Sequence, residues 1–130
     1  MFDLKKAMGA AAAGMSAQSF RLRLVGENIA NVDTSGFQRK TVNFINVMDR
    51  ARGTTTVKTG EVQLDRTDPR VSLDPGNPLA DERGMVTLSN VNPLIEIADA
   101  REAQRSYQTN LSIFDQARRM HSATLDLIRR

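Results

Sequence analysis

The 130-residue chain has no cysteine and no tryptophan, and it has only one tyrosine and one histidine. Without cysteine, disulfides, thiolate nucleophiles and sulfur-ligated metal sites are all excluded. No run approaches the roughly 20 apolar residues of a membrane-spanning helix. A cleaved signal peptide is not expected either, because Asp3, Lys5 and Lys6 interrupt the start of the chain. These absences predict a soluble protein, or one delivered by a route that needs no cleaved signal.

Large apolar side chains are also scarce. The hydrophobic fraction is 40% and the aromatic fraction 5%, so the apolar content depends heavily on Ala and Met. A compact chain of this length buries roughly two-thirds of its unfolded surface. A core built from such small side chains suggests that a partner supplies part of the packing.

Charge is divided unevenly along the chain. Residues 1–60 carry nine Lys and Arg against four Asp and Glu, whereas residues 61–130 carry nine against eleven. The basic half permits nucleic-acid binding or a membrane-surface role for residues 1–30. Aromatic stacking platforms and helix-turn-helix spacing are missing. The division equally suits like subunits that pack basic surface against acidic surface.

The N-terminal region has a heptad pattern of apolar residues that predicts a helix over residues 3–31. Its apolar members, which we expect to form an assembly interface, are Leu4, Met8, Ala11, Met15, Leu22, Val25 and Ile29. Gly9, Gly14 and Gly26 disfavour a helix on propensity alone. Together with Ala10 to Ala13 they create a smooth strip that another helix could approach closely.

The C-terminal region predicts a second long helix, over residues 93–129. Asn92 is a favourable N-cap, and Pro93 suits the first helical position. The apolar members of its main heptad row, also expected at the assembly interface, are Ile97, Ala100, Tyr107, Leu111, Phe114, Leu125 and Ile128. A second row beside it contains Ile113, Ala117, Met120, Thr124 and Leu127.

The period changes between the two helices. Short stretches such as TTTVK and MVTLS within residues 54–90 are interrupted by DP and DPGNP, which predicts hairpin or irregular structure. The acidic stretch 61–82 is expected to face water. We therefore predict a mainly α fold in which the terminal helices pair as a coiled coil or bundle around a small irregular or β-hairpin insert. The expected division is 1–31, 32–92 and 93–130, acting as one structural unit.

Enzyme chemistry finds no support in the sequence. His121 lies in a helical row, and no Gly-x-Ser-x-Gly elbow, P-loop or EF-hand spacing is present. Glu96, Asp99 and Glu102 recur at intervals of three and could gather around a metal. The favoured interpretation is that they are solvated and interact with the helix dipole. We expect no catalytic, cofactor or metal site.

The stretch NIANVDTSGFQRK at 28–40 predicts an abrupt helix end. The side chains of Asn31, Asp33 and Thr34 can turn onto nearby backbone, and Gly36 can adopt positive φ. Phe37 then places an apolar anchor just after the turn. We expect this turn to redirect the chain from the helix into a lateral arm.

These termini resemble the flagellar axial proteins, the family of rod, hook and hook–filament junction subunits. The family's turn motif A-N-x-x-T-x-G-[FY] matches Ala30, Asn31, Thr34, Gly36 and Phe37. The S-Y-Q-x-N core of its C-terminal helix matches Ser106, Tyr107, Gln108 and Asn110. The stretch DPGNPLADERGMVTLSNVNP is similar to that of a proximal rod protein, with departures at Met85, where an aromatic is usual, and Ser89, where proline is usual. The resemblance is compatible with either of two sister proximal rod proteins.

The resemblance implies a structural subunit of the proximal flagellar rod, the drive shaft that crosses the periplasm and forms the wall of the export channel. The implied partners are copies of the chain itself, other rod subunits, the type III export apparatus and the base of the basal body. No nucleic-acid, cofactor or small-molecule partner is implied. The rival hypothesis is a cytosolic coiled-coil adaptor or chaperone, which leaves the DPGNPLADERG insert unexplained.

Overall fold

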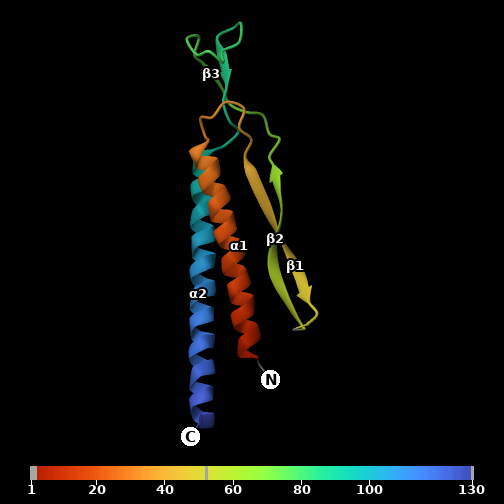
Figure 1. The fold of residues 1–130 in the computed structure, drawn as a ribbon. Helices are drawn as coiled ribbons and strands as arrows, with labels where there is room; N and C mark the ends of the chain where they lie inside the picture. Colours follow the sequence, from red (N-terminus) through yellow and green to blue (C-terminus); the bar gives the residue numbers. More distant parts are fainter. Residues whose placement is uncertain (1–2, 52, 130) are drawn as a thin grey trace.

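The computed structural model describes residues 3–51 and 53–129. Six elements follow one another: α1 (Leu4–Ala30), β1 (Lys40–Asp49), β2 (Thr54–Leu64), β3 (Val71–Leu73), β4 (Met85–Thr87) and α2 (Pro93–Arg129). The helices run side by side and antiparallel, with β1 and β2 beside α1 and the smaller strands beyond one end of the pair (Figure 1). Two long terminal helices with a small β insert are thus confirmed. Within the described residues, no helix is both long and apolar enough to cross a membrane.

Both helices begin at residues that satisfy free backbone donors. The Asp3 carboxylate accepts a hydrogen bond from the Lys5 N–H at 2.9 Å, and the Asn92 side chain accepts one from the Leu94 N–H at 3.1 Å. Pro93 opens α2 as predicted. The expected spans of 3–31 and 93–129 agree with the structure to within one residue at each end. Because α2 has 37 residues and α1 has 27, α2 is longer by about 15 Å.

Small and polar side chains form the seam between the helices. Asn28 donates a hydrogen bond to Glu96 at 3.2 Å, a Cβ on Gly14 would lie 2.7 Å from the Asn110 Nδ2, and Ala7 and Ala117 border one hollow. These pairs are separated by whole heptads, by 14 and then by 7 residues on each helix, in an antiparallel register. We call these three pairs the seam, together with Arg21 on α1 and the buried Ala103 on α2, which occupy the heptad position between Asn28–Glu96 and Gly14–Asn110.

The predicted smooth strip on α1 is confirmed at Gly14, which is buried against α2. Ala11 and Ala17 are buried nearby. Gly26 differs, since a Cβ there would meet nothing within 4 Å. The close approach of the helices therefore depends on Gly14 and its neighbours.

Strands β1 and β2 pair as an antiparallel hairpin, with Asp49 opposite Thr54 and Gly53 in the turn at φ +65°. The register shifts between Val42 and Phe44. At this shift a Cβ on Gly60 would lie 3.3 Å from the Asn43 carbonyl oxygen. The hairpin returns along α1 (Figure 1). The expected lateral arm is wrong in direction, because α1 offers the hairpin a surface to pack against.

Strand β1 is not predicted by the sequence pattern. Its KTVNFINVMD stretch pairs with the predicted TTTVK region, whereas MVT in β4 pairs with VSL in β3. Between these short strands, Gly84 has a φ of +75° and faces Pro75. The acidic stretch 61–82 is almost wholly exposed, as expected.

Candidate assembly interface

The turn after α1 is held by its own side chains. Asn31 caps the helix by donating a side-chain hydrogen bond to the Glu27 carbonyl at 2.8 Å. Thr34 donates its hydroxyl hydrogen to the Asn31 side-chain oxygen at 3.0 Å. Gly36 has a φ of +75°, so its predicted conformation is confirmed. The Asp33 side chain was expected to bond nearby backbone. Its carboxylate instead lies 3.7 Å from the Arg70 guanidinium.

Asn28 joins α1, β1 and α2. Its side chain accepts a hydrogen bond from the Lys40 N–H at 2.9 Å and donates one to the Lys40 carbonyl at 2.9 Å. This amide therefore pairs with the first residue of β1 much as a neighbouring strand would. The same NH₂ group donates to the buried Glu96. Since an unpaired buried amide is costly, these three bonds fix the start of β1 relative to α1 and α2.

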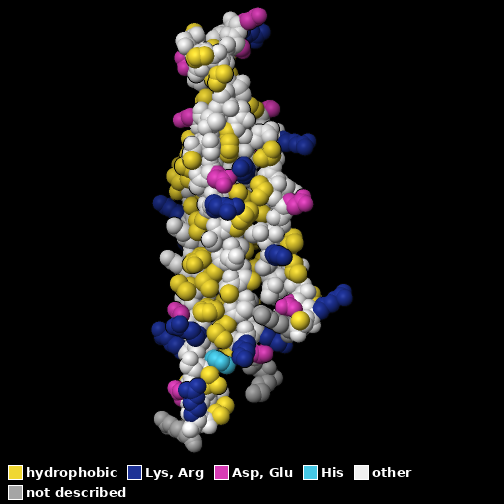
Figure 2. All heavy atoms as spheres, in the orientation of Figure 1, with side chains coloured by type: hydrophobic (Ala, Val, Ile, Leu, Met, Phe, Trp, Pro, Cys, Tyr) yellow, Lys and Arg dark blue, Asp and Glu magenta, His cyan; other side chains and the backbone are white. Residues whose placement is uncertain are grey.

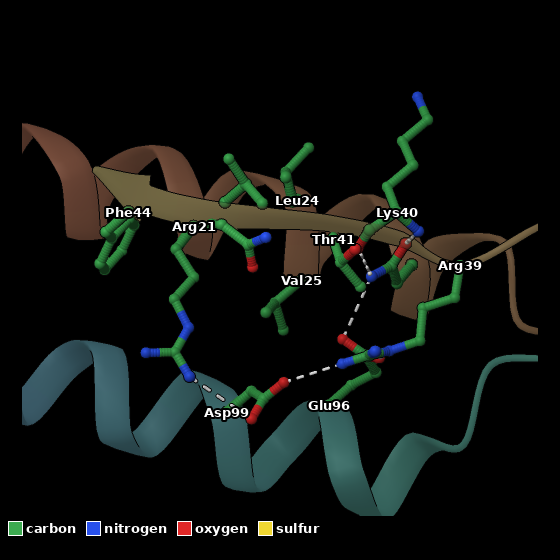
Figure 3. Close-up of a pocket in the computed structure, with 12 residues that line it drawn as sticks. Arg21, Leu24, Val25, Arg39, Lys40, Thr41, Phe44, Glu96 and Asp99 are labelled. Carbon is green, nitrogen blue, oxygen red and sulfur yellow. Dashed lines mark hydrogen bonds and ion pairs between the residues drawn. The ribbon is translucent and has the colours of Figure 1, made fainter. Parts of the chain in front are cut away.

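Arg39 gathers three carboxylates from two parts of the chain. Its guanidinium pairs with Glu96, with Asp99 at 2.9 Å and with Asp65 at 3.7 Å. Asp99 also lies 3.5 Å from Arg21 on α1, so one carboxylate links both arginines (Figure 3). We call Asn28, Arg39, Asp65, Glu96 and Asp99 the elbow cluster.

Protonation in the elbow cluster follows from these contacts. Burial lowers the pKa of Arg39, but its bond to Glu96 and the charges of Glu96, Asp99 and Asp65 outweigh this and raise it. The pKa of Asp65 is held below its usual value, first by the backbone and hydroxyl of Thr67 and then by Arg39. Arg39 and Asp65 are consequently oppositely charged near neutral pH.

Ser89 and Asn90, which lie just before α2, bind the segment that joins α1 to β1. The Arg39 N–H donates to the Asn90 side-chain oxygen at 2.6 Å, and the Asn90 amide donates to the Asp65 carbonyl at 2.8 Å. Ser89 is fully buried; its hydroxyl donates to the Val32 carbonyl and accepts from the Val91 N–H at 3.2 Å. Ser89, where the family pattern has proline, therefore makes two bonds that proline cannot make.

The prediction that the α2 carboxylates are solvated is wrong for two of the three. Glu96 is fully buried and Asp99 is largely buried, because each pairs with arginine. Glu102 is exposed as expected, with a side-chain exposure of 68% and a long 3.5 Å contact to Arg21. Sequence reasoning did not identify Asn28, Arg39 or Asp65 as functional residues.

This arrangement positions chain segments and is not set up to transform a substrate. Arg21, Arg39 and Glu96 border a cleft of about 270 Å³ between α1, β1 and α2 (Figure 3). The cluster's carboxylates are paired with arginine, which leaves them unavailable as metal ligands. Among the described residues, no group of His, Asp and Glu side chains could hold a metal ion.

The large apolar side chains lie beside the seam. On α2 the predicted main row begins one residue after the seam residue Glu96. Ile97, Leu111 and Leu125 in this row are 44%, 42% and 40% exposed. On α1, Ala11 and Val25 of the predicted row are buried, while Ile29 is exposed. Figure 2 shows hydrophobic side chains along the surface of both helices.

The predicted interface residues thus fall into three groups by burial. The buried ones are Ala11 and Val25. The half-buried ones are Leu4, Met8, Met15, Leu22, Ala100, Tyr107 and Phe114. The exposed ones are Ile29, Ile97, Leu111, Leu125 and Ile128. We call the half-buried and exposed members the outer rows, because the chain itself leaves these side chains wholly or partly uncovered.

In an antiparallel pair, equivalent flanks of the two helices lie on one side of the seam. Met8, Met15, Leu22 and Ile29 each follow an α1 seam residue by one position, and Ile97, Leu111 and Leu125 follow the α2 seam in the same way. The outer rows therefore form one apolar face across both helices, on the flank away from Ala17 and Phe20. Ala17 and Phe20 border the groove beside β1 and β2.

Comparison with known proteins supports the resemblance at both ends of the chain. Residues 8–38 match the family model described as flagella basal body rod protein, and residues 82–127 match flagellar basal body rod FlgEFG protein C-terminal. These matches include the turn after α1 and most of α2.

Full-length relatives are similar as well. The chain is 44% identical to the flagellar basal-body rod protein FlgC of Agrobacterium fabrum, covering 99% of this chain and 98% of the relative. It is 32% identical to FlgC of Salmonella typhimurium over 90% and 92% of the two chains, and 33% identical to FlgC of Aquifex aeolicus over 97% and 98%. Of the two sister proximal rod proteins, FlgC and FlgB, these relatives carry the name FlgC. The chain therefore belongs to the family of flagellar basal-body rod proteins, and within that family it is FlgC-like.

Proposed function

We propose that this chain is a structural subunit of the proximal flagellar rod that polymerises through its terminal helices. The observation that carries the proposal is the division of side chains between seam and outer rows. Small and polar residues hold α1 to α2, while large apolar residues such as Leu111 are left exposed. Large apolar side chains that lie exposed along one flank of a helix pair are characteristic of an interaction site.

Polymerisation explains why the helices are built in this way. A neighbouring subunit that covered the outer rows would gain about 25 cal/mol for each Å² of apolar surface removed from water. The three segments 1–31, 32–92 and 93–130 then act as one structural unit, because the elbow cluster joins all three. In the assembly, the helices would pair as a coiled coil or bundle and form the drive shaft and the wall of the export channel.

The proposed partners are copies of this chain, other rod subunits, the type III export apparatus and the base of the basal body. The proposed location is the rod in the periplasm, reached through the export channel without a cleaved signal peptide. Membership of a family of structural rod proteins supports the expectation that the chain is not an enzyme. Nothing in the cleft beside Arg39 favours a small-molecule substrate.

Deletion of the gene followed by purification of basal bodies tests this function. We expect the deletion strain to build no complete rod and to stop swimming, and a plasmid copy to restore both. Recovery of the chain within the purified basal bodies is the required positive result. A strain that swims normally without the chain, or a chain found only as a soluble cytosolic dimer, would instead support an adaptor or chaperone.

A further inference from the structure

Strand β1 has one edge that no other described strand covers. Within the described residues it pairs only with β2, so its other edge presents backbone N–H and C=O groups without a strand beside them. At the start of this edge, the Asn28 side chain bonds both backbone groups of Lys40. Farther along, α1 packs mainly against β2, and the last part of β1 lies on the outer side of the hairpin (Figure 1). Residues 43–48 are all exposed, so both faces of β1 are open here.

The composition of β1 makes this edge suited to strand pairing. Residues 41–48 contain no charged residue, no proline and no glycine, and charges stand only at the ends of the strand, on Lys40 and Asp49. Proteins usually protect an exposed strand edge with charges, proline or a bulge. An uncharged stretch with Val, Ile and Phe that lacks this protection readily pairs with another strand.

Strand β2 carries the protection that β1 lacks. The register shifts between Val42 and Phe44 of β1, because two residues of β2, Gly60 and Glu61, lie opposite a single β1 residue. The bulge therefore belongs to β2, where it interrupts pairing along the outer edge of that strand. Glu61 and Lys58 add exposed charges to β2. Strand β1, by contrast, alternates regularly along its whole length.

The exposed part of β1 is complementary to itself. In an antiparallel pairing of two copies centred on Asn46, the two Asn46 amides lie opposite each other. Phe44 then lies opposite Met48 of the second copy, and Ile45 lies opposite Val47. Each apolar side chain thus meets another apolar side chain, and no charges of the same sign are brought together. Cross-strand pairs of this kind stabilise antiparallel sheets.

We propose that the free edge of β1 binds the same edge of a second copy of this chain, in an antiparallel pairing centred on Asn46. The pairing joins two hairpins into one four-stranded sheet, in the order β2, β1, β1, β2. A two-stranded hairpin alone is only marginally stable, and additional strands stabilise it. The contact is two-fold symmetric, so it uses the same surface on both copies. It is also closed, because the outer edges of the new sheet are the bulged edges of β2.

This pairing goes beyond the proposed rod function and does not depend on it. Because the paired strands are antiparallel, the helix pairs of the two copies point in opposite directions. The outer rows lie on the flank away from the groove beside β1 and β2, so the pairing leaves them uncovered. The paired copies are therefore a form of the free chain, distinct from the contacts between subunits through the outer rows.

Disulfide formation tests the pairing directly, because the unmodified chain has no cysteine. Asn46→Cys in the full-length chain would place two thiols opposite each other, at a Cα separation of about 4.5–5.5 Å that a disulfide can span. With glutathione disulfide as oxidant, we expect at least about fivefold more covalent dimer from Asn46→Cys than from Gln63→Cys. Gln63 is the matched control, since it is exposed on β2. Adding Leu111→Asp to Asn46→Cys should leave the yield unchanged, because the pairing does not use the outer rows.

Charge at the two-fold axis provides a second test, by sedimentation velocity. Asn46→Lys or Asn46→Asp alone places like charges directly opposite each other, so each variant should dimerise at least about fivefold more weakly than the unmodified chain. An equimolar mixture of the two brings opposite charges together and should restore dimerisation to within about twofold. Gln63→Lys and Gln63→Asp are the matched controls, and each should change dimerisation by less than about twofold.

Equal yields of covalent dimer from Asn46→Cys and Gln63→Cys would overturn the pairing. A mixture that dimerises as weakly as the single charge variants would overturn it as well, and so would an unmodified chain that stays monomeric. Recovery of the chain from purified basal bodies depends on none of these results. Failure of the β1 pairing is thus distinguished from failure of the rod function.

Discussion

The inner seam and the outer rows of the helix pair are built from opposite kinds of side chain. The seam brings together Gly14 with Asn110 and Asn28 with Glu96, and Ala103 within it is fully buried. The outer rows contain Leu111 and Leu125, which are exposed. A helix pair that served only its own stability would place large apolar residues inside, as amphipathic helices ordinarily do.

This difference supports the proposal that folding and assembly use separate surfaces. Inside the chain, the helices approach closely at Gly14 and charges pair in the elbow cluster. Outside, apolar side chains such as Leu111 are exposed, and we propose that neighbouring subunits cover them. Changes to the seam should therefore lower the stability of the single chain, and changes to the outer rows should mainly affect assembly.

The largest expected effect on the single chain comes from Glu96→Ala. The substitution leaves Arg39 and the Asn28 amide without their buried partner, and breaking a buried ion pair costs about 3–5 kcal/mol. The free energy of unfolding is measured by urea titration of the helical circular dichroism signal. Glu102→Ala, on the same helix but exposed, is the control and should stay within about 0.5 kcal/mol. Equal effects of the two substitutions would show that the elbow cluster does not hold the seam.

Gly14→Leu tests the close approach of the helices. Its side chain would collide with Asn110, and overpacking of this kind costs about 1–3 kcal/mol. Gly26→Leu introduces the same side chain into open space and should be neutral or stabilising, because leucine favours a helix over glycine by up to about 1 kcal/mol. The comparison uses the same urea titration. If Gly14→Leu does not lower the free energy of unfolding, the helices do not approach each other closely at Gly14.

Gly36→Val examines the elbow turn. A β-branched residue at a φ of +75° is strained by about 1–3 kcal/mol. We expect lower stability and reduced swimming when the variant replaces the unmodified chain in cells. Gly76→Val is the control, since a side chain at that glycine would enter open space and its φ lies outside the left-handed region. Normal motility with Gly36→Val would separate the turn from assembly.

The smallest expected effect is a pH dependence at Asp65. Its pKa in the folded chain is below the ordinary 3.8, so its charge contributes stability above that value, and the contribution is lost as the pH falls through the folded pKa. The stability difference between the unmodified chain and Asp65→Asn should accordingly shrink as the pH is lowered below 3.8. Asp68→Asn serves as the exposed control. A difference that grows on acidification would contradict the assigned direction.

Local features of this fold could be predicted from sequence, whereas its long-range pairings could not. The cap at Asn92 and the turn at Gly36 depend on residues a few positions apart. The bond between Asn28 and Glu96 spans 68 residues, and that between Arg39 and Glu96 spans 57. Nothing within one short stretch shows that Glu96 has a partner, so its helical spacing alone predicts a solvated side chain.

The packed row predicted for α2 differs from the observed seam for a related reason. A heptad pattern of large apolar residues predicts that the row of Leu111 and Phe114 is the packed one. The packed row contains Ala103, Asn110 and Ala117. Because two of these side chains are small and the third is polar, the row does not stand out in a hydrophobic pattern. The sequence feature that indicates this packed row is the strip of small residues around Gly14 on α1, because a helix with small residues on one face can pack closely against a facing helix.

The most direct measurement compares two properties of Leu111→Asp, with Ser112→Asp on the same helix as the control. Leu111 lies in the outer rows, and Ser112 is exposed outside them. For Leu111→Asp, the account predicts a free energy of unfolding within about 1 kcal/mol of the unmodified chain, together with loss of the chain from purified basal bodies. Ser112→Asp should change neither property. Normal recovery of Leu111→Asp in basal bodies, or a loss of single-chain stability as large as that of Glu96→Ala, would contradict the separation of seam from outer rows.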